Sequence, residues 1–418
     1  MSASRDNADM DSLVTRTAAG WRLPAVPNLH SHAFQRAMAG MAERRTDPAD
    51  SFWTWRETMY RFAGRMTPET MRAVAAQLYV EMLEAGFGSV CEFQYVHHQP
   101  DGTPYDDPAA MSRALVEAAR ETGIRMTLLP VLYMTGGFDG RPLSERQARF
   151  GHDVESYLRL LERLRGFEDG RLRVGACFHS LRAVPKVAMR QVLEALPGGM
   201  PVHVHIAEQI GEVQDSLALR DARPVEWLYE NFEVGARWAL VHATHLTAEE
   251  TRRIAGSGAT VVLCPTTEAN LGDGLFPLRD YLDAGGRWGI GSDSHISVSP
   301  VEELRWLEYG QRLVSRHRNI AVGASESVGE TLLGGALAGG GNVTGFDASD
   351  DWVELDPEAP ALVGATAEDV VDRWVFSGNR PAVETVCIDG QMLVSGGRHR
   401  DREAIFSRYR RAIADLTT

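Results

Sequence analysis

The sequence predicts a (β/α)8 barrel with a small appendage, and two observations support the barrel. Between residues 25 and 293, eight short apolar, β-branched runs alternate with longer segments of helical periodicity. The runs are continuously apolar, as expected for parallel strands that are covered on both faces. Eight strand–helix units of this combined length fit a (β/α)8 barrel. A doubly wound open sheet is the alternative, but we find no GxGxxG or Walker A turn to support it.

The predicted strands and helices alternate regularly along this part of the chain. The eight strands are expected at residues 25–30, 86–93, 125–133, 172–178, 201–206, 238–243, 259–264 and 287–292. The helices are expected at 67–85, 108–122, 144–165, 186–196, 222–231, 247–256 and 300–316. Two of them carry clear start signals. Thr67 precedes a first-turn proline, and Thr247 with Glu250 forms a capping box.

The chain changes character after residue 320. Residues 321–345 are rich in Gly and Ala, with helical runs. Short strand-like segments are expected at 352–355, 373–377 and 383–395, the last with a turn at Asp389 and Gly390, and a terminal helix at 401–416. We therefore expect three parts: an N-terminal segment (1–24) that joins the appendage, a barrel (25–345), and a C-terminal β appendage with the terminal helix (346–418).

Composition and charge exclude several classes of protein. The chain has 418 residues, of which 44% are hydrophobic and 24% charged, as in ordinary globular proteins. Its net charge of −14 disfavours nucleic acid and anionic membranes as partners, although a local pair of arginines can still bind a small anion. The four cysteines are scattered in apolar runs and fit reduced core thiols. With a polar N-terminus and no apolar span, the sequence predicts a cytoplasmic protein.

Histidines and one aspartate stand at the ends of four predicted strands. His30 and His32 alternate along the first strand, so their imidazoles point to the same side. His205 ends the fifth strand, His242 the sixth, and Asp293 the eighth. Strand ends gather at one mouth of a (β/α)8 barrel, so these side chains should meet around one point. His30, His32, His205 and Asp293 form a four-ligand set that suits one Zn²⁺, although iron or another divalent metal would also suit it.

Glu208 lies three residues after His205, in the loop over the predicted mouth. A carboxylate there can move protons without touching the metal. His242 is open to two interpretations: it either ligates the metal or orients the attacking water. A metal-activated water, a proton acceptor at Asp293 and a proton donor at Glu208 together predict hydrolysis at a carbon bonded to nitrogen. We expect a single metal, because the fourth strand ends without a lysine that could bridge two ions.

This pattern resembles the amidohydrolase superfamily, which carries HxH on strand one, His on strand five with Glu three residues on, His on strand six and Asp on strand eight. Longer motifs are similar to the formimidoylglutamate deiminase family within it. They include NLHSHAFQRAMAG (28–40), WTWRETMY (53–60), EFQYVHH (92–98), FHSLRAV (178–184), HVHIAEQ (203–209), LVHATHLT (240–247) and GSDSHISVSPVEELRWLEYGQRL (291–313). The resemblance covers the whole predicted barrel, residues 24–316.

The resemblance implies an activity and assigns roles to residues. It implies hydrolysis of N-formimidoyl-L-glutamate to N-formyl-L-glutamate and ammonia in histidine degradation, by a homodimer. The implied zinc ligands are His30, His32, His205 and Asp293, and the implied proton-transfer residues are Glu208, His242 and Asp293. The implied substrate contacts are Gln35, Arg56, Tyr95, His179 and Arg182. Independently, a guanidinium is the natural partner of a substrate carboxylate, and both arginines are expected in loops after barrel strands.

Two other functions remain open at this point. The chain could be another mononuclear-zinc deaminase that acts on a cyclic amidine such as guanine, or a non-catalytic barrel that only binds a ligand. The resemblance also implies a β-sandwich built from both chain ends. Here the residues before position 25 do not alternate like strands, so we expect a reduced sandwich whose N-terminal share is truncated or replaced.

Overall fold

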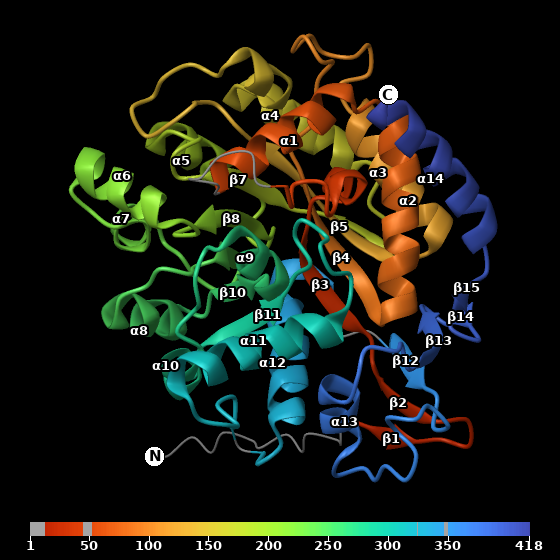
Figure 1. The fold of residues 1–418 in the computed structure, drawn as a ribbon. Helices are drawn as coiled ribbons and strands as arrows, with labels where there is room; N and C mark the ends of the chain where they lie inside the picture. Colours follow the sequence, from red (N-terminus) through yellow and green to blue (C-terminus); the bar gives the residue numbers. More distant parts are fainter. Residues whose placement is uncertain (1–12, 45–51, 324, 347–349) are drawn as a thin grey trace.

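The computed structural model describes residues 13–44, 52–323, 325–346 and 350–418 (Figure 1). In these residues the chain forms a barrel of parallel strands surrounded by helices, with an antiparallel sheet beside it. The predicted (β/α)8 barrel with a small appendage from the chain ends is therefore confirmed. No helix in the described part of the chain is long and apolar enough to span a bilayer.

Eight parallel strands form the barrel wall, and each overlaps a predicted strand. They are β3 (Val26–Ser31), β4 (Phe87–Gln94), β5 (Arg125–Leu132), β7 (Ala176–Ser180), β8 (Val202–Ile206), β9 (Trp238–His242), β10 (Thr260–Leu263) and β11 (Arg287–Ile290). The short β6 (Leu172–Val174) pairs with β5 beside β7. A parallel bridge between Ser31 and Asp293 joins the first strand to the residues that follow the last one, so the barrel closes at the predicted metal site.

The predicted helices are also present, with small shifts at their ends. They are α2 (Pro68–Ala85), α3 (Ala110–Thr122), α4 (Val154–Arg165), α5 (Lys186–Ala195), α7 (Pro224–Asn231), α8 (Ala248–Ser257) and α11 (Pro300–Ser315). Thr67 and Thr247 cap α2 and α8 through their side chains, as their capping signals predict. The segment expected as one helix over 144–165 is instead a 3-10 helix, η2 (Glu145–Phe150), followed by α4.

Five helical segments in the connections after barrel strands were not predicted. They are η1 (Ala33–Met38), α1 (Phe52–Arg65), α6 (Ile210–Arg220), α9 (Pro265–Leu271) and α10 (Leu278–Asp283). The Gly/Ala-rich segment forms α12 (Val328–Thr344). A Cβ at Gly339 would lie 2.1 Å from the carbonyl oxygen of Trp288, so glycine is required there for α12 to pack against β11.

The appendage is a six-stranded antiparallel sheet to which both chain ends contribute. Its strands, in spatial order, are β1 (Thr15–Arg16), β2 (Trp21–Pro24), β12 (Trp352–Leu355), β13 (Val383–Ile388), β14 (Gln391–Ser395) and β15 (Arg398–His399). The expectation of no strands before the barrel was wrong. Strand β2 buries Trp21 and Leu23, but four residues are too few for their alternation to stand out in the sequence.

The strand expected at 373–377 was also wrong. This segment belongs to a helix, α13 (Val370–Phe376), whose buried residues Val370, Val371, Trp374 and Val375 recur at helical spacing. The predicted turn at Asp389 and Gly390 is present, and both residues have positive φ angles, 52° and 72°, as a tight hairpin requires. The terminal helix, α14 (Arg402–Thr417), lies along α2 (Figure 1).

Candidate active site

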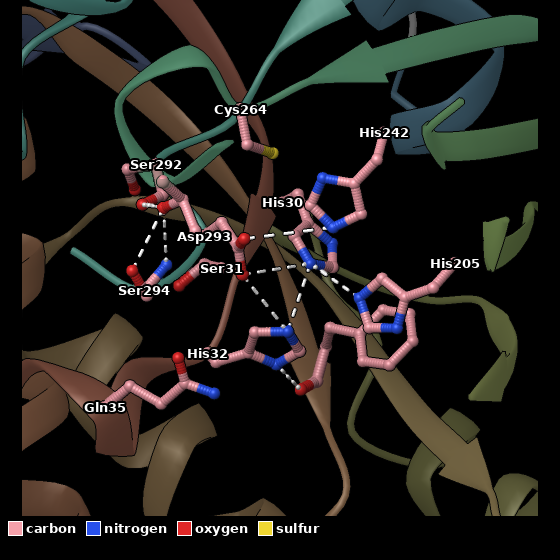
Figure 2. A network of polar contacts seen from close by, with 12 residues as sticks. His30, Ser31, His32, Gln35, His205, His242, Cys264, Ser292, Asp293 and Ser294 are labelled. Atoms are coloured by element: carbon pink, nitrogen blue, oxygen red, sulfur yellow. Dashed lines mark hydrogen bonds and ion pairs between the residues drawn. The ribbon is translucent and has the colours of Figure 1, made fainter. Parts of the chain in front are cut away.

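The four predicted metal ligands converge at the carboxyl ends of the barrel strands. Figure 2 shows the imidazoles of His30, His32 and His205 turned toward one another, with the Asp293 carboxylate beside them. Nε2 of His30 lies 3.1 Å from Nε2 of His32 and 3.0 Å from Nε2 of His205. Oδ1 of Asp293 lies 3.5 Å from Nε2 of His30 and 3.4 Å from Nε2 of His32. All four side chains are buried.

The hydrogen bonds of two of these histidines determine which ring nitrogen carries the proton. Nδ1 of His32 lies 3.0 Å from the carbonyl oxygen of Phe93, and Nδ1 of His205 lies 2.9 Å from that of His179. Because a carbonyl only accepts, each Nδ1 is the donor and each Nε2 presents a lone pair to the centre of the cluster. Burial lowers the pKa of His30 to about 3 and lowers the pKa values of His32 and His205, so the three rings are neutral.

This arrangement fits a divalent metal ion. His30 can donate from Nε2 to only one of its two neighbours, so without a cation at least one close pair of lone pairs would repel. A cation between the three nitrogens converts this repulsion into attraction, and Asp293 supplies an anionic oxygen on the same side. Three imidazole nitrogens and one carboxylate oxygen, with room for water, are typical of catalytic zinc sites.

The backbone is bent where two strands deliver their side chains to this cluster. His242 and Asp293 have φ angles of 70° and 45°, a left-handed conformation that costs energy for residues with a Cβ. At Asp293 the bend is fixed by the barrel seam: its N–H donates to the carbonyl of His30 (3.0 Å), and its carbonyl accepts from the N–H of His32 (3.1 Å). The same hydrogen bonds thus close the barrel and place the carboxylate.

His242 lies beside the ligand cluster and contacts two carboxylates. Its Nε2 lies 3.9 Å from Oδ2 of Asp293, and its Nδ1 lies 3.2 Å from Oε1 of Glu268. Although burial alone would lower the pKa of His242, the carboxylates of Glu208, Glu268 and Asp293 raise it to about 10. His242 also stands with His30 and His205 in a group of side chains that could hold a metal ion, so its position suits a ligand as well as a neighbour that orients the attacking water.

Glu208 faces the same space from the loop after β8. Its side chain is 7% exposed, and its backbone N–H donates to Oε2 of Glu212 (3.1 Å). Burial raises the pKa of Glu208, with the Asp293 carboxylate adding to the effect and His242 opposing it. A carboxyl group with a raised pKa can hold a proton near neutral pH, as a general acid must.

A cavity opens at the cluster, and every residue predicted to contact substrate lines it. These residues are Gln35, Arg56, Tyr95, His179 and Arg182. Nε2 of Gln35 donates to Oη of Tyr95 (3.0 Å). Arg56 was expected in a loop, but it lies on α1, where its guanidinium is 5.0 Å from the centre of the Tyr60 ring. Arg182 follows β7 in a turn, as expected.

A second layer of polar contacts holds the HxH segment. Glu92, two residues before the end of β4, accepts hydrogen bonds from Ser31 Oγ and Ala33 N, both at 2.6 Å. His295 contacts Ser31 Oγ (3.2 Å) and Ser292 Oγ (3.0 Å), so it lies behind Asp293. Sequence reasoning gave no role to Glu92 or Glu268. The sequence did carry a signal for Glu92, because it is an acidic residue within an apolar run that was predicted to be a barrel strand.

Comparisons with known proteins agree with this geometry. The model of the amidohydrolase family matches residues 22–328. A formimidoylglutamate deiminase from Pseudomonas aeruginosa is 51% identical over 390 residues, which are 91% of this chain and 86% of the relative. The crystal structure of an amidohydrolase from Brucella melitensis has a TM-score of 0.90 and 46% identity, covering 95% of this chain and 90% of that one. An adenosine deaminase from Xanthomonas campestris, solved with bound zinc, shares the fold, with a TM-score of 0.77, 19% identity, and coverage of 95% and 86%.

Proposed function

The chain belongs to the amidohydrolase family, and on this premise we propose that it hydrolyses N-formimidoyl-L-glutamate to N-formyl-L-glutamate and ammonia in histidine degradation. One observation carries the proposal: a single cavity has a metal-ligand cluster at its floor and two arginines, Arg56 and Arg182, in its wall. The substrate needs both, because an amidine carbon must be attacked by water and two carboxylates must be neutralised.

We assign the metal to His30, His32, His205 and Asp293, and zinc is the metal that this donor set suits best. Bound there, zinc would lower the pKa of a water molecule to about 7 and so supply hydroxide at neutral pH. The ligands are held before any substrate binds, because His32 and His205 are fixed by backbone carbonyls and Asp293 by the barrel seam.

The proton transfers fall to Asp293, His242 and Glu208. Oδ2 of Asp293 faces His242 and is placed to take a proton from the attacking water. His242 presents Nε2 to the same space and holds the water and the developing negative charge in place. The raised pKa of Glu208 suits it to deliver a proton to the terminal nitrogen. Water thus adds to the formimidoyl carbon, its two protons pass to the terminal nitrogen by way of Asp293 and Glu208, the bond to this nitrogen breaks, and ammonia leaves.

The arginines in the cavity wall suit the two carboxylates of the substrate. Arg56 approaches from α1 and Arg182 from the turn after β7. Burial holds the pKa of His179 well below its usual range, so this residue contacts the substrate as a neutral imidazole. Gln35 and Tyr95 form a hydrogen-bonded pair on the wall next to His32. Amides and aromatic stacking can hold a nucleobase, whereas a dicarboxylate needs cations, so the two arginines favour a dicarboxylate over guanine.

The test is an ammonia-release assay with N-formimidoyl-L-glutamate, N-formimidoyl-L-aspartate and guanine as substrates. We expect the highest kcat/KM with N-formimidoyl-L-glutamate. Release from guanine alone would overturn the proposal in favour of a cyclic-amidine deaminase, and release from none of the three would favour a barrel that only binds.

We also propose that the chain acts as a cytoplasmic homodimer on this small molecule, with the barrel over 25–345 as one unit and the chain ends, 1–24 and 346–418, as the appendage. The single sheet that both chain ends share supports the division into barrel and appendage. Light scattering of the purified protein tests the dimer, since a mass near 46.0 kDa would show a monomer.

A further inference from the structure

Tyr133 lies at the mouth of the barrel, beside the residues proposed to contact substrate. It directly follows the last residue of β5 and lines the same cavity as Arg56 and Arg182. Its side chain is 3% exposed, and its ring centre is 4.4 Å from that of His179. Its Oη lies 2.8 Å from Nε2 of Gln147, on η2.

The direction of this hydrogen bond follows from the other contacts of Gln147. Oε1 of Gln147 lies 3.0 Å from the backbone N of Ser144 and 2.9 Å from its Oγ. A backbone N–H can only donate, so this end of the amide must be the oxygen. Nε2 therefore donates to Tyr133, and the phenol oxygen is the acceptor.

A phenol carries one proton, and this bond does not use it. Among the described residues no group accepts the proton of Tyr133, although the side chain is buried at the cavity wall. A buried donor without an acceptor costs free energy, so such groups mark places where a ligand completes the hydrogen bond. Gln147 thus turns the hydroxyl into a donor for a cavity ligand.

The position of Tyr133 indicates which part of a ligand it meets. The backbone N–H groups of Met134 and Thr135 donate to the carbonyl of Ala183 at 2.8 and 3.0 Å, so the end of β5 lies against the turn that carries Arg182. Since both side chains line the cavity and stand on these adjoining segments, we place the hydroxyl donor and the guanidinium in the same part of the cavity. Neutral and cationic donors side by side form a carboxylate subsite.

We propose that Tyr133 is a substrate-binding residue whose hydroxyl donates to one of the two substrate carboxylates, next to Arg182. The inference rests on the proposed function and deepens it. Tyr157 provides the contrast within the same chain. Its Oη contacts the carbonyl of Pro130 (3.0 Å) and accepts from the N–H of Cys177 (2.9 Å), so its hydrogen bonds are satisfied inside the core.

The experiment compares Tyr133→Phe with Tyr157→Phe in the metal-loaded enzyme. Steady-state assays use N-formimidoyl-L-glutamate and two analogues that each keep one carboxylate, the N-formimidoyl derivatives of 4-aminobutanoate and 2-aminobutanoate. Because one hydrogen bond to a charged group is lost, we expect Tyr133→Phe to lower kcat/KM for the diacid by about ten- to a hundredfold, mostly through KM. With the analogue that keeps the carboxylate contacted by Tyr133, Tyr133→Phe should lower kcat/KM by a similar factor. With the analogue that lacks this carboxylate, kcat/KM of the variant should lie within twofold of wild type. Metal content should not change.

Calorimetry of the binding of the product, N-formyl-L-glutamate, gives a readout that needs no turnover. Tyr133→Phe should weaken this binding by a similar factor, and Tyr157→Phe should leave it unchanged. A Tyr133→Phe enzyme within twofold of wild type on the diacid would overturn the inference, as would equal losses on both analogues. A wild-type enzyme that binds the product but releases no ammonia would instead contradict the proposed function. In that case the calorimetric measurement of product binding still tests the role of Tyr133.

Discussion

Glu268 accepts a hydrogen bond from the imidazole of His242, with Oε1 of the glutamate 3.2 Å from Nδ1 of the histidine. The same oxygen lies 2.9 Å from the backbone N of Cys264, which fixes the carboxylate at the start of α9. Glu268 therefore determines which His242 nitrogen faces inward: Nδ1–H points to the glutamate, and Nε2 points toward Asp293. Partners of this kind fix the tautomer and the orientation of the ring.

We expect Glu268→Ala to lower kcat by about 10–100-fold, the usual cost of losing a partner that orients a catalytic group. Glu268→Gln should recover part of this loss, because its amide oxygen still accepts from Nδ1–H. The measurement is a double-mutant cycle with His242→Ala. If Glu268 acts through His242, adding Glu268→Ala to His242→Ala changes kcat little further. Multiplicative losses in the double variant would contradict this positioning role.

Glu208→Gln separates proton transfer from metal binding. The side chain is buried above the ligand cluster, and no carboxylate oxygen of Glu208 is among the atoms that could hold the metal. We expect the variant to keep its metal but to lose about 10²–10⁴ in kcat, the size of a general acid–base contribution. Metal analysis and steady-state kinetics check the two parts, and Glu230→Gln, an exposed residue of α7, is the matched control. Full activity in Glu208→Gln would remove this residue from the mechanism.

The arginine pair tests the carboxylate end of the cavity. Arg56→Ala and Arg182→Ala should each lower kcat/KM for N-formimidoyl-L-glutamate by about 10-fold or more, since a hydrogen bond to a charged group contributes roughly 1.5–3 kcal/mol. Arg190→Ala, at an exposed site on α5, should have no such effect. Unchanged kinetics in both active-site variants would show that the substrate is not a dicarboxylate.

The barrel and its metal cluster could be predicted because both depend on strand positions. Parallel strands buried on both faces leave continuous apolar runs, and strand ends must meet at one mouth, so His30, His205 and Asp293 could be brought together from positions far apart in the sequence. The predicted substrate contacts came from the resemblance, and the structure places all five around the cavity.

Other features depend on loop geometry that periodicity does not encode. Glu268 meets His242 only because α9 begins directly after β10 and turns the carboxylate back toward β9. Tyr133 becomes a donor only through Gln147, which η2 brings next to the end of β5. The helix over 370–376 is rich in β-branched and aromatic residues, which favour strands locally, but tertiary packing selects the helix.

A buried histidine cluster behind the cavity wall predicts acid sensitivity. The ring of His152 is centred 4.6 Å from that of His97 and 4.7 Å from that of His98. Burial lowers the pKa of His152 to about 3, and nearby His98 adds to the effect. Between this value and 6.5, the unfolded chain binds a proton that the folded chain does not, so stability falls as the pH drops below 6.5.

The wild-type protein should lose unfolding free energy between pH 7.5 and pH 5.0, and His152→Gln should lose about 2 kcal/mol less. The figure corresponds to one proton taken up by the unfolded chain over the 1.5 pH units between 6.5 and 5.0. Urea unfolding at the two pH values measures the difference. The exposed His317 provides the control variant, His317→Gln, which should keep the wild-type pH dependence. An identical pH dependence in His152→Gln would contradict the assignment.

Two histidines of β8 give the sharpest test of the metal site. His205 directs Nε2 to the cluster, whereas His203, two residues earlier, contacts the carbonyl of Val343 (2.8 Å) in the core. We expect wild type and His203→Ala to purify with about one metal ion per chain and His205→Ala with little. Because a metal that binds only the folded state adds about 2.7 kcal/mol at a hundredfold excess over Kd, chelation should lower the Tm of wild type but not of His205→Ala. If wild type purified without chelators held less than about 0.2 metal ions per chain, the proposed metal site would be contradicted. The close approach of the three histidine nitrogens would then have no explanation.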